Sequence, residues 1–333
     1  MLAAVEPPKH RRPPPWRRRP SRRALALAAL LLASLLGAPP LIKFFVAEQI
    51  GNQVNRVPDV FAPLEDAARP PLTGALTFLL VGTDTLSDAP TTGTGADGDG
   101  LGRDRSDVLM LARVDATRTG ATIVSIPRDS WVDIPGHGRS KINSAYATGG
   151  PSLLVQTVEG LTGLRVDHLA VIDFAGFQAL VDAVDGIDVA TGTGPIVSHL
   201  DGEAALKFVR QRQAEPLGDL DRVRQEQMAL RALLVKAMSN GALTDPGGLY
   251  RLLDAARTSV GVDDTLTNGR LRAVAADLRK VQPTAVRFVQ APIERWGSEG
   301  NQPVAYLAPY ATELWSALRS DTLDNYLYQH STG

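Results

Sequence analysis

Apolar residues in the first half of the chain fall into short blocks that predict strands. Residues 75–82 (ALTFLLVG), 108–114 and 121–126 are apolar runs of strand length, bounded by polar or turn-forming residues. The second and third runs are separated only by a polar turn at 115–120, which predicts two buried strands that pair with each other. A further strand is expected at 168–174.

Helical spacing alternates with these strands. Pro151 is a normal first helical residue and predicts a helix to about Thr162, and a short amphipathic helix is expected at 175–184. A third helix begins after Asp201, and residues 219–238 have the pattern of a long amphipathic helix. Strands that alternate with helices predict an α/β layered fold.

The last third of the chain continues this pattern without a break in composition. Residues 241–281 carry two helical patterns, and strands are expected at 284–290 and 304–307. A closing helix is expected at 309–319, with a frayed tail after about Leu327. The sequence therefore predicts one folded domain.

An uncharged segment near the N-terminus predicts membrane attachment. Residues 24–42 hold no charge over 19 positions, which suffices for a spanning helix, and the basic residues 1–23 before it predict a cytoplasmic N-terminus. A cleaved signal peptide is the alternative. Residues 43–72 are interpreted as a stalk and 73–333 as one extracytoplasmic catalytic domain with its core at 75–240. We therefore expect a cell-membrane protein that crosses the bilayer once, with its N-terminus in the cytoplasm.

The charge is unevenly distributed along the chain. Residues 1–23 hold eight of the 35 basic residues and one of the 36 acidic residues, so the remainder has 27 and 35, a net charge of −8. This balance predicts no nucleic-acid partner for the folded part. The chain has no cysteine, which excludes disulfides, thiol catalysis and cysteine-based metal sites.

Carboxylates and arginines are found at the ends of the predicted strands. Asp84 follows the first strand and Asp107 precedes the second, and carboxylate oxygens suit a hard cation such as Mg²⁺ or Mn²⁺. Arginines cluster at positions 103/105, 128, 210/212 and 222/224. Because arginine binds phosphate oxygens bidentately, this pattern favours chemistry at a phosphate or pyrophosphate. The alternative is that these charges only cap strands or solvate the surface.

Several motifs resemble those of a known family. The runs RSDVLMLARVD, VSIPRDSWVDIP, KINSAYATGG, VDHLAVIDFAGFQALVDAVDGIDV, HLDGEAALKFVRQR and DLDRVRQEQ occur in the order found in the LytR–CpsA–Psr family. The combination of IPRD with the following KIN-x-AY-x-x-GG is specific. The resemblance covers roughly residues 75–240, and 241–333 match only loosely.

The resemblance implies a fold and an activity. The fold implied is a three-layer α/β/α sandwich around a mixed central sheet, with an apolar pocket for a prenyl chain. The activity implied is transfer of a glycopolymer from a polyprenyl-pyrophosphate carrier to a peptidoglycan sugar hydroxyl outside the membrane. Such an enzyme is a phosphotransferase of cell-wall assembly, with Mg²⁺ as its cofactor.

The resemblance also implies roles for particular residues. By position, Asp84 and Asp107 match the aspartates that the family associates with Mg²⁺. The residues that match its pyrophosphate-binding arginines, or lie in motifs near the same site, are Arg105, Arg128, Lys141, Asn143, Arg210, Arg212, Arg222 and Arg224. Catalysis is expected of Asp84, Asp107, Arg128, Arg210 and Arg212, and substrate binding of the others. Asp219 and Asp221 are candidates for the general base, as is a metal-bound water.

Two departures from the family pattern keep other functions open. Asp84 is followed by Thr85-Leu86 where an arginine is common, and Gln225 stands where a second arginine often follows Arg222. The alternatives are a polyprenyl-pyrophosphate hydrolase, a non-catalytic lipid-carrier binding protein, and an envelope-related transcriptional attenuator.

Overall fold

A computed structural model describes residues 54–83, 106–190, 197–210, 218–239, 248, 251–252, 254–256, 260–278 and 280–330. Side chains of a few residues in these ranges, Asp107 and residues 218–224 among them, are not described. The expected membrane segment, residues 24–42, lies outside the described residues. Within the described part, no helix is both long and apolar enough to cross a membrane.

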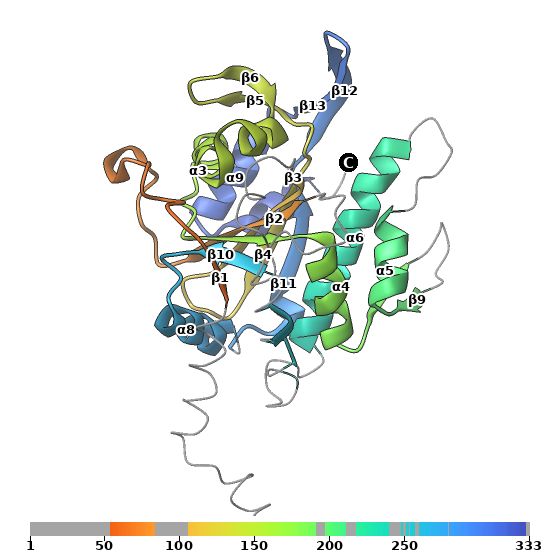
Figure 1. The fold of residues 1–333 in the computed structure, drawn as a ribbon. Coiled ribbons are helices and arrows are strands. Elements are labelled where there is room, and N and C mark those ends of the chain that lie inside the picture. Colours follow the sequence, from red (N-terminus) through yellow and green to blue (C-terminus); the bar gives the residue numbers. More distant parts are fainter. Residues whose placement is uncertain are drawn as a thin grey trace, which may run out of the picture. The chain divides into compact units, whose positions relative to one another are not determined.

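The centre of the fold is a seven-stranded mixed sheet in the order β1-β10-β7-β2-β3-β4-β11 (Figure 1). The strands are β1 (Asn55–Val57), β2 (Leu76–Thr83), β3 (Ser106–Val114), β4 (Ala121–Ile126), β7 (His168–Ile172), β10 (Val260–Asp263) and β11 (Val286–Gln290). β2, β3 and β4 are antiparallel neighbours, whereas β7 runs parallel to β2 and β11 parallel to β4. The expected α/β fold with a mixed sheet is confirmed.

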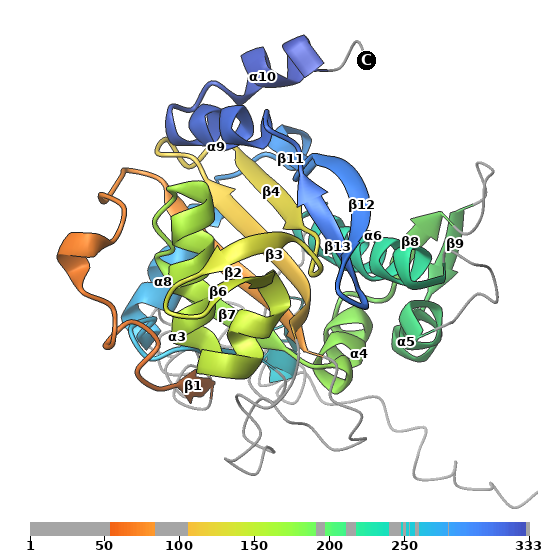
Figure 2. The ribbon, with the colours of Figure 1, turned by 90° about the horizontal axis from the view of Figure 1, so that it is seen from above.

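Helices cover both faces of this sheet (Figures 1 and 2). The helices are α3 (Ile142–Thr162), α4 (Phe174–Ala183), α5 (Gly202–Arg210), α6 (Gly218–Ser239), α8 (Asn268–Leu278), α9 (Ala311–Arg319), α10 (Leu323–His330) and the 3-10 turns η2 (Asp66–Ala68) and η3 (Pro283–Ala285). α3 and α9 share the larger apolar core with one face of β2, β3, β4 and β7. α4, α5 and α6 enclose a second core on the other side.

Three two-stranded hairpins lie outside the central sheet. They are formed by β5 (Trp131–Ile134) with β6 (Gly138–Lys141), by β8 (Ile187–Ala190) with β9 (Val197–Leu200), and by β12 (Ile293–Glu299) with β13 (Gln302–Leu307). The β5–β6 and β12–β13 hairpins stand at the same end of the molecule's sheet (Figure 1). They contact each other through the bridge between Ser130 and Ala305.

Residues 43–72 were expected to form a stalk outside the folded domain. Their described part, residues 54–72, belongs to the folded unit, because β1 pairs with β10 and both Val57 and Val60 are buried in the larger core. The Arg69 guanidinium binds the Glu159 carboxylate, with Nη2 at 2.8 Å from Oε1. The apolar anchors that hold this segment are too few and too widely spaced to be recognised from the sequence.

Candidate functional site

Arg128 lies at the end of β4 in a segment that helix α3 holds in place. The first N–H groups of a helix have no partner inside it. Here the Ile142 N–H donates to the Ser130 carbonyl at 2.9 Å, and the Asn143 N–H donates to the Arg128 carbonyl at 3.2 Å. Ile142 and Tyr146 are fully buried and anchor this first turn in the core. The backbone around Arg128 is therefore fixed on both sides.

Asp129 joins two of the expected site residues. Its Oδ1 lies 2.8 Å from Lys141 Nζ, and its Oδ2 lies 3.7 Å from Arg128 Nε. All three side chains are largely buried. Among the contacts of the described residues, one carboxylate thus lies within reach of two cations. An arginine and a lysine held together suit a phosphate group, because both bind its oxygens.

The expected aspartate pair is associated with neighbouring strands. Thr83, which immediately precedes Asp84 in the sequence, pairs with Ser106, which immediately precedes Asp107. The register of β2 and β3 shifts at this point. Asp84 itself lies outside the described residues, and Asp107 is placed only by its backbone in β3.

The residue before Asp107 in β3 is a buried serine. Ser106 is fully buried, and its hydroxyl has no hydrogen-bond partner among the described residues. A buried hydroxyl without a partner costs about 1–3 kcal/mol, so a ligand that it can bind would stabilise this position. Carboxylate and hydroxyl oxygens are the ligand types that Mg²⁺ prefers. The donor types of the two expected aspartates therefore suit the expected metal, while their side chains lie outside the described residues.

Arg210 lies at the rim of an apolar cavity. Its Cζ stands 4.8 Å from the centre of the Phe174 ring, and Phe174 lines the cavity. The other lining residues come from the ends of β2, β3 and β7 and from three helices: Gly82, Thr83, Val108, Ile172, Asp173, Phe177, Val209 and Leu230. β3 pairs with β4 up to Leu109 and Ile126, so this cavity and Arg128 lie at the same end of the sheet.

The cavity is narrow in this structure. Its volume is about 40 Å³, whereas pockets that hold small ligands are about 300–1,000 Å³. A prenyl chain would therefore require α4 and α6 to move apart.

The remaining expected site residues are only partly placed. Asn143 is buried in the first turn of α3, close to Arg128 through the backbone bond described above. Arg222 and Arg224 lie in the first half of α6, but their side chains are not described. Arg105 and Arg212 lie outside the described residues. The structure thus brings Arg128, Lys141 and Asn143 together.

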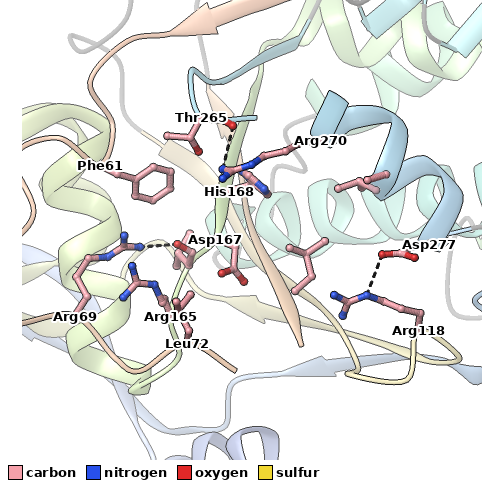
Figure 3. A pocket seen from close by; sticks show the side chains of 14 residues that line it. Phe61, Arg69, Leu72, Arg118, Arg165, Asp167, His168, Thr265, Arg270 and Asp277 are labelled. Carbon is pink, nitrogen blue, oxygen red and sulfur yellow. Dashed lines mark hydrogen bonds and ion pairs between the residues drawn. The ribbon is translucent and has the colours of Figure 1, made fainter. Parts of the chain in front are cut away.

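A larger cavity lies at the opposite end of the sheet (Figure 3). It has a volume of about 480 Å³ and contains none of the expected site residues. Its arginines already have protein partners: Arg69 binds Glu159, Arg165 binds Asp66, Arg118 binds Asp277, and Arg270 donates to the Thr265 carbonyl. Size alone therefore does not make it the site of phosphate chemistry.

Two acidic groups near this cavity have altered pKa values. Burial raises the pKa of the Asp167 carboxyl, which accepts a hydrogen bond from the Thr77 N–H at 2.8 Å. Burial acts in the same direction on Asp263, but hydrogen bonds from His168 and Thr265 outweigh it, so the pKa of Asp263 lies below its usual value. The ionised Asp263 carboxylate fixes the orientation of the His168 ring.

Asp129 and Phe174 are site residues that the sequence did not single out. Asp129 stands next to Arg128, and adjacent opposite charges at a strand end were the only signal for its role. Phe174 has the pattern of an ordinary core residue. Its position at the cavity rim depends on where β7 ends, which the sequence does not define.

Comparison with known proteins identifies relatives. Residues 62–320 match the family model described as the LytR_cpsA_psr family. The cell wall biosynthesis protein LcpB of Corynebacterium glutamicum, a name given to it as probable, is 38% identical over 240 residues, 68% of this chain and 56% of that protein. A protein of Enterococcus faecalis named polyisoprenyl-teichoic acid–peptidoglycan teichoic acid transferase TagU is 33% identical over 214 residues, 60% of this chain and 65% of that protein. The chain thus spans less than two thirds of the length of either relative.

A solved structure shares the fold. It is the LytR-CPS2A-psr family protein YwtF (TagT) with bound octaprenyl pyrophosphate lipid, with a TM-score of 0.53. The likeness covers 76% of this chain and 93% of that one at 22% identity.

Proposed function

The chain belongs to the LytR_cpsA_psr family, and from this membership we propose that it transfers a glycopolymer from a polyprenyl-pyrophosphate carrier to a peptidoglycan sugar hydroxyl. The observation that carries the proposal is the cluster of Arg128, Asp129 and Lys141. This cluster lies at the end of the sheet where the apolar cavity is found. A cationic centre at the same end of the sheet as an apolar cavity suits a ligand with a pyrophosphate head and a hydrocarbon tail. The names of TagU and of the lipid-bound YwtF (TagT) support the same substrate class.

In the proposed reaction, an acceptor hydroxyl attacks the phosphorus on the sugar side of the pyrophosphate. The new O–P bond forms as the bond to the bridging oxygen breaks, polyprenyl phosphate leaves, and the hydroxyl proton passes to a base. Asp219 and Asp221, in the first turn of α6, are the candidates for that base among the chain's side chains. Arg128 and Arg210 bind the phosphate oxygens and stabilise the charge that develops on them.

The metal is part of the proposal. Asp84 and Asp107 would hold Mg²⁺ or Mn²⁺, since carboxylate oxygens are the ligands that these cations prefer. When bound, such a cation neutralises charge on the pyrophosphate. We also propose that residues 24–42 anchor the protein in the cell membrane with the catalytic domain outside, because eight basic residues precede this uncharged segment.

The experiment is a transfer assay on the full-length protein in detergent, with a polyprenyl-pyrophosphate-linked glycan, Mg²⁺ and soluble peptidoglycan fragments. Asp107→Ala and Arg128→Ala are expected to abolish transfer while the thermal unfolding midpoint stays close to that of the wild type. The matched control is Asp133→Asn, an exposed carboxylate on β5. Retained transfer by both alanine variants refutes the assignment, and release of glycan phosphate without peptidoglycan fragments identifies a hydrolase instead.

A further inference from the structure

The β12–β13 hairpin exposes a tryptophan beside the candidate site. The chain has four tryptophans. Trp315 in α9 is 2% exposed, as expected of a core residue, whereas Trp296 in β12 is 41% exposed. A tryptophan with about two fifths of its surface exposed on a two-stranded hairpin leaves part of a large aromatic ring open to a ligand. Such residues are often used for binding, because they bury a large area with little loss of conformational freedom.

The hairpin is attached to the segment that carries Arg128. Ala305 of β13 donates its N–H to the Asp129 carbonyl at 2.8 Å and forms a bridge with Ser130. Trp296 is the cross-strand partner of Ala305, so the two side chains lie on the same face of the hairpin. Only Ala305 therefore separates the backbone of Trp296 from that of the residues next to Arg128.

The surroundings of Trp296 are polar. Ser298 is exposed on the same face of β12 as Trp296, and the exposed Glu294 lies at the irregularity that precedes them, whereas the exposed Arg295 and Glu299 lie on the other face. On the opposite face, the Arg295 guanidinium lies 3.7 Å from the centre of the Tyr306 ring, and the Tyr306 hydroxyl donates to Glu299. The hairpin thus presents separate aromatic rings among hydrogen-bonding groups.

This arrangement fits a carbohydrate better than a protein partner. The centre of a protein–protein interface is depleted in charged residues and is surrounded by further apolar contacts, which this hairpin lacks. A pyranose ring has an apolar face of C–H groups and a rim of hydroxyls. An exposed aromatic ring can stack on the face while neighbouring charged and hydroxyl side chains bind the rim.

We propose that the β12–β13 hairpin binds the acceptor, a β-1,4-linked glycan strand, with one sugar stacked on Trp296. This inference rests on the proposed function, in which an acceptor hydroxyl must reach a phosphate held by Arg128. Trp296 of β12 pairs with Ala305 of β13, and the Ala305 N–H donates to the Asp129 carbonyl. The hairpin and the segment that carries Arg128 are therefore joined by backbone hydrogen bonds. A strand held on the hairpin therefore extends along the edge of the transfer site.

The first test measures glycan binding without any lipid substrate. The full-length protein in detergent is titrated calorimetrically with a soluble tetrasaccharide released from peptidoglycan by a muramidase. Trp296→Ala is expected to weaken binding by about tenfold, and Trp296→Phe, which keeps a stacking ring, to retain most of the affinity. Tyr328→Ala removes an aromatic residue that is 81% exposed on α10 and should bind as the wild type does. Unchanged affinity in Trp296→Ala, or an equal loss in Tyr328→Ala, overturns the inference.

The second test separates this inference from the proposed function. In the transfer assay, Trp296→Ala is expected to raise the KM for the tetrasaccharide acceptor about tenfold and to leave the KM for the lipid-linked donor unchanged. Transfer with an unaltered acceptor KM refutes the acceptor site but leaves the proposed function standing. If the wild type transfers nothing yet its glycan binding depends on Trp296, the glycan site stands and the proposed function fails.

Discussion

Asp129 Oδ1 lies 2.8 Å from Lys141 Nζ, and this contact ties the end of β6 to the end of β4. The same carboxylate lies 3.7 Å from Arg128 Nε, so Asp129 contacts two cations of the candidate site. The two cations come from segments separated by the whole β5–β6 hairpin. Asp129 thus acts through its neighbours, as a positioning residue.

Replacing Asp129 should therefore impair transfer without unfolding the protein. Asp129→Asn keeps the shape but removes the charge that holds Lys141 and Arg128, and misplaced catalytic groups cost about tenfold to a hundredfold in rate. The measurement is kcat in the transfer assay together with the unfolding midpoint. Asp133→Asn, on the exposed side of the same hairpin, serves as the control and should leave kcat unchanged. Equal rates for both variants would show that Asp129 positions nothing.

Replacing Arg210 tests whether the residues next to the apolar cavity bind the lipid-linked donor. Arg210→Lys keeps the positive charge but loses the planar group that stacks on Phe174 and binds phosphate bidentately. The KM for the lipid-linked donor is expected to rise about tenfold. Lys207→Ala, an exposed residue on the same helix, is the control and should have no effect. Wild-type donor kinetics in Arg210→Lys would remove this arginine from the site.

The ion pair between Arg69 and Glu159 makes a prediction about stability. Glu159 is 4% exposed and accepts hydrogen bonds from Arg69 and from the Val166 N–H. Glu159→Ala leaves a buried guanidinium without its partner, so the free energy of unfolding should fall by about 3–5 kcal/mol. Urea unfolding measures this loss. Glu203→Ala breaks the exposed pair with Lys207 and should cost less than about 1 kcal/mol.

Asp167 predicts a pH dependence of stability. Burial raises its pKa in the folded chain, with Arg165 and Arg69 acting in the opposite direction. Between the unfolded and folded pKa values the folded chain binds more protons, so this group lowers the free energy of unfolding as pH rises above about 4. Asp167→Asn removes that loss, and an acceptor remains for the Thr77 N–H. The variant should gain stability over the wild type more at pH 7 than at pH 4 in urea unfolding, and a pH-independent difference would contradict this.

The sequence predicted those parts of the fold whose apolar runs are long. The strands expected at 75–82, 108–114 and 121–126 correspond to β2, β3 and β4, and the expected helix at 309–319 corresponds to α9. β10, in contrast, lies within residues 241–281, for which only helices were expected. Its four residues take strand conformation because β1 and β7 pair with them on both sides, and no local pattern reports such distant partners.

Hairpins and kinks show the same limitation. The β5–β6 hairpin was not expected, because β5 alternates over only four residues and β6 contains no apolar residue. A helix was expected only from Pro151, but α3 begins at Ile142 and bends at Gly149 and Gly150, where Gly150 adopts a φ of 64° that glycine tolerates. This earlier start is what brings Asn143 to Arg128.

The sequence predicted which types of residue form the site, but not which of their side chains contact one another. Strand ends and the family motifs together pointed to Arg128 and Lys141, which the structure does bring together. The carboxylate that links them and the aromatic residue under Arg210 depend on tertiary contacts. The metal assignment to Asp84 and Asp107 stays a prediction.

The pairing of β1 with β10 imposes an order on folding. Arg56 Nη2 donates to the Asn268 side chain at 2.8 Å across 212 residues of sequence, so the strand nearest the N-terminus has its partner close to the end of the chain. A chain that is synthesised from its N-terminus cannot complete this edge of the sheet until residues 260–263 have been made. Until then the edge of β7 is unpaired, and unpaired strand edges favour aggregation. This edge of the sheet therefore closes only after β2, β3, β4 and β7 are all available to pair.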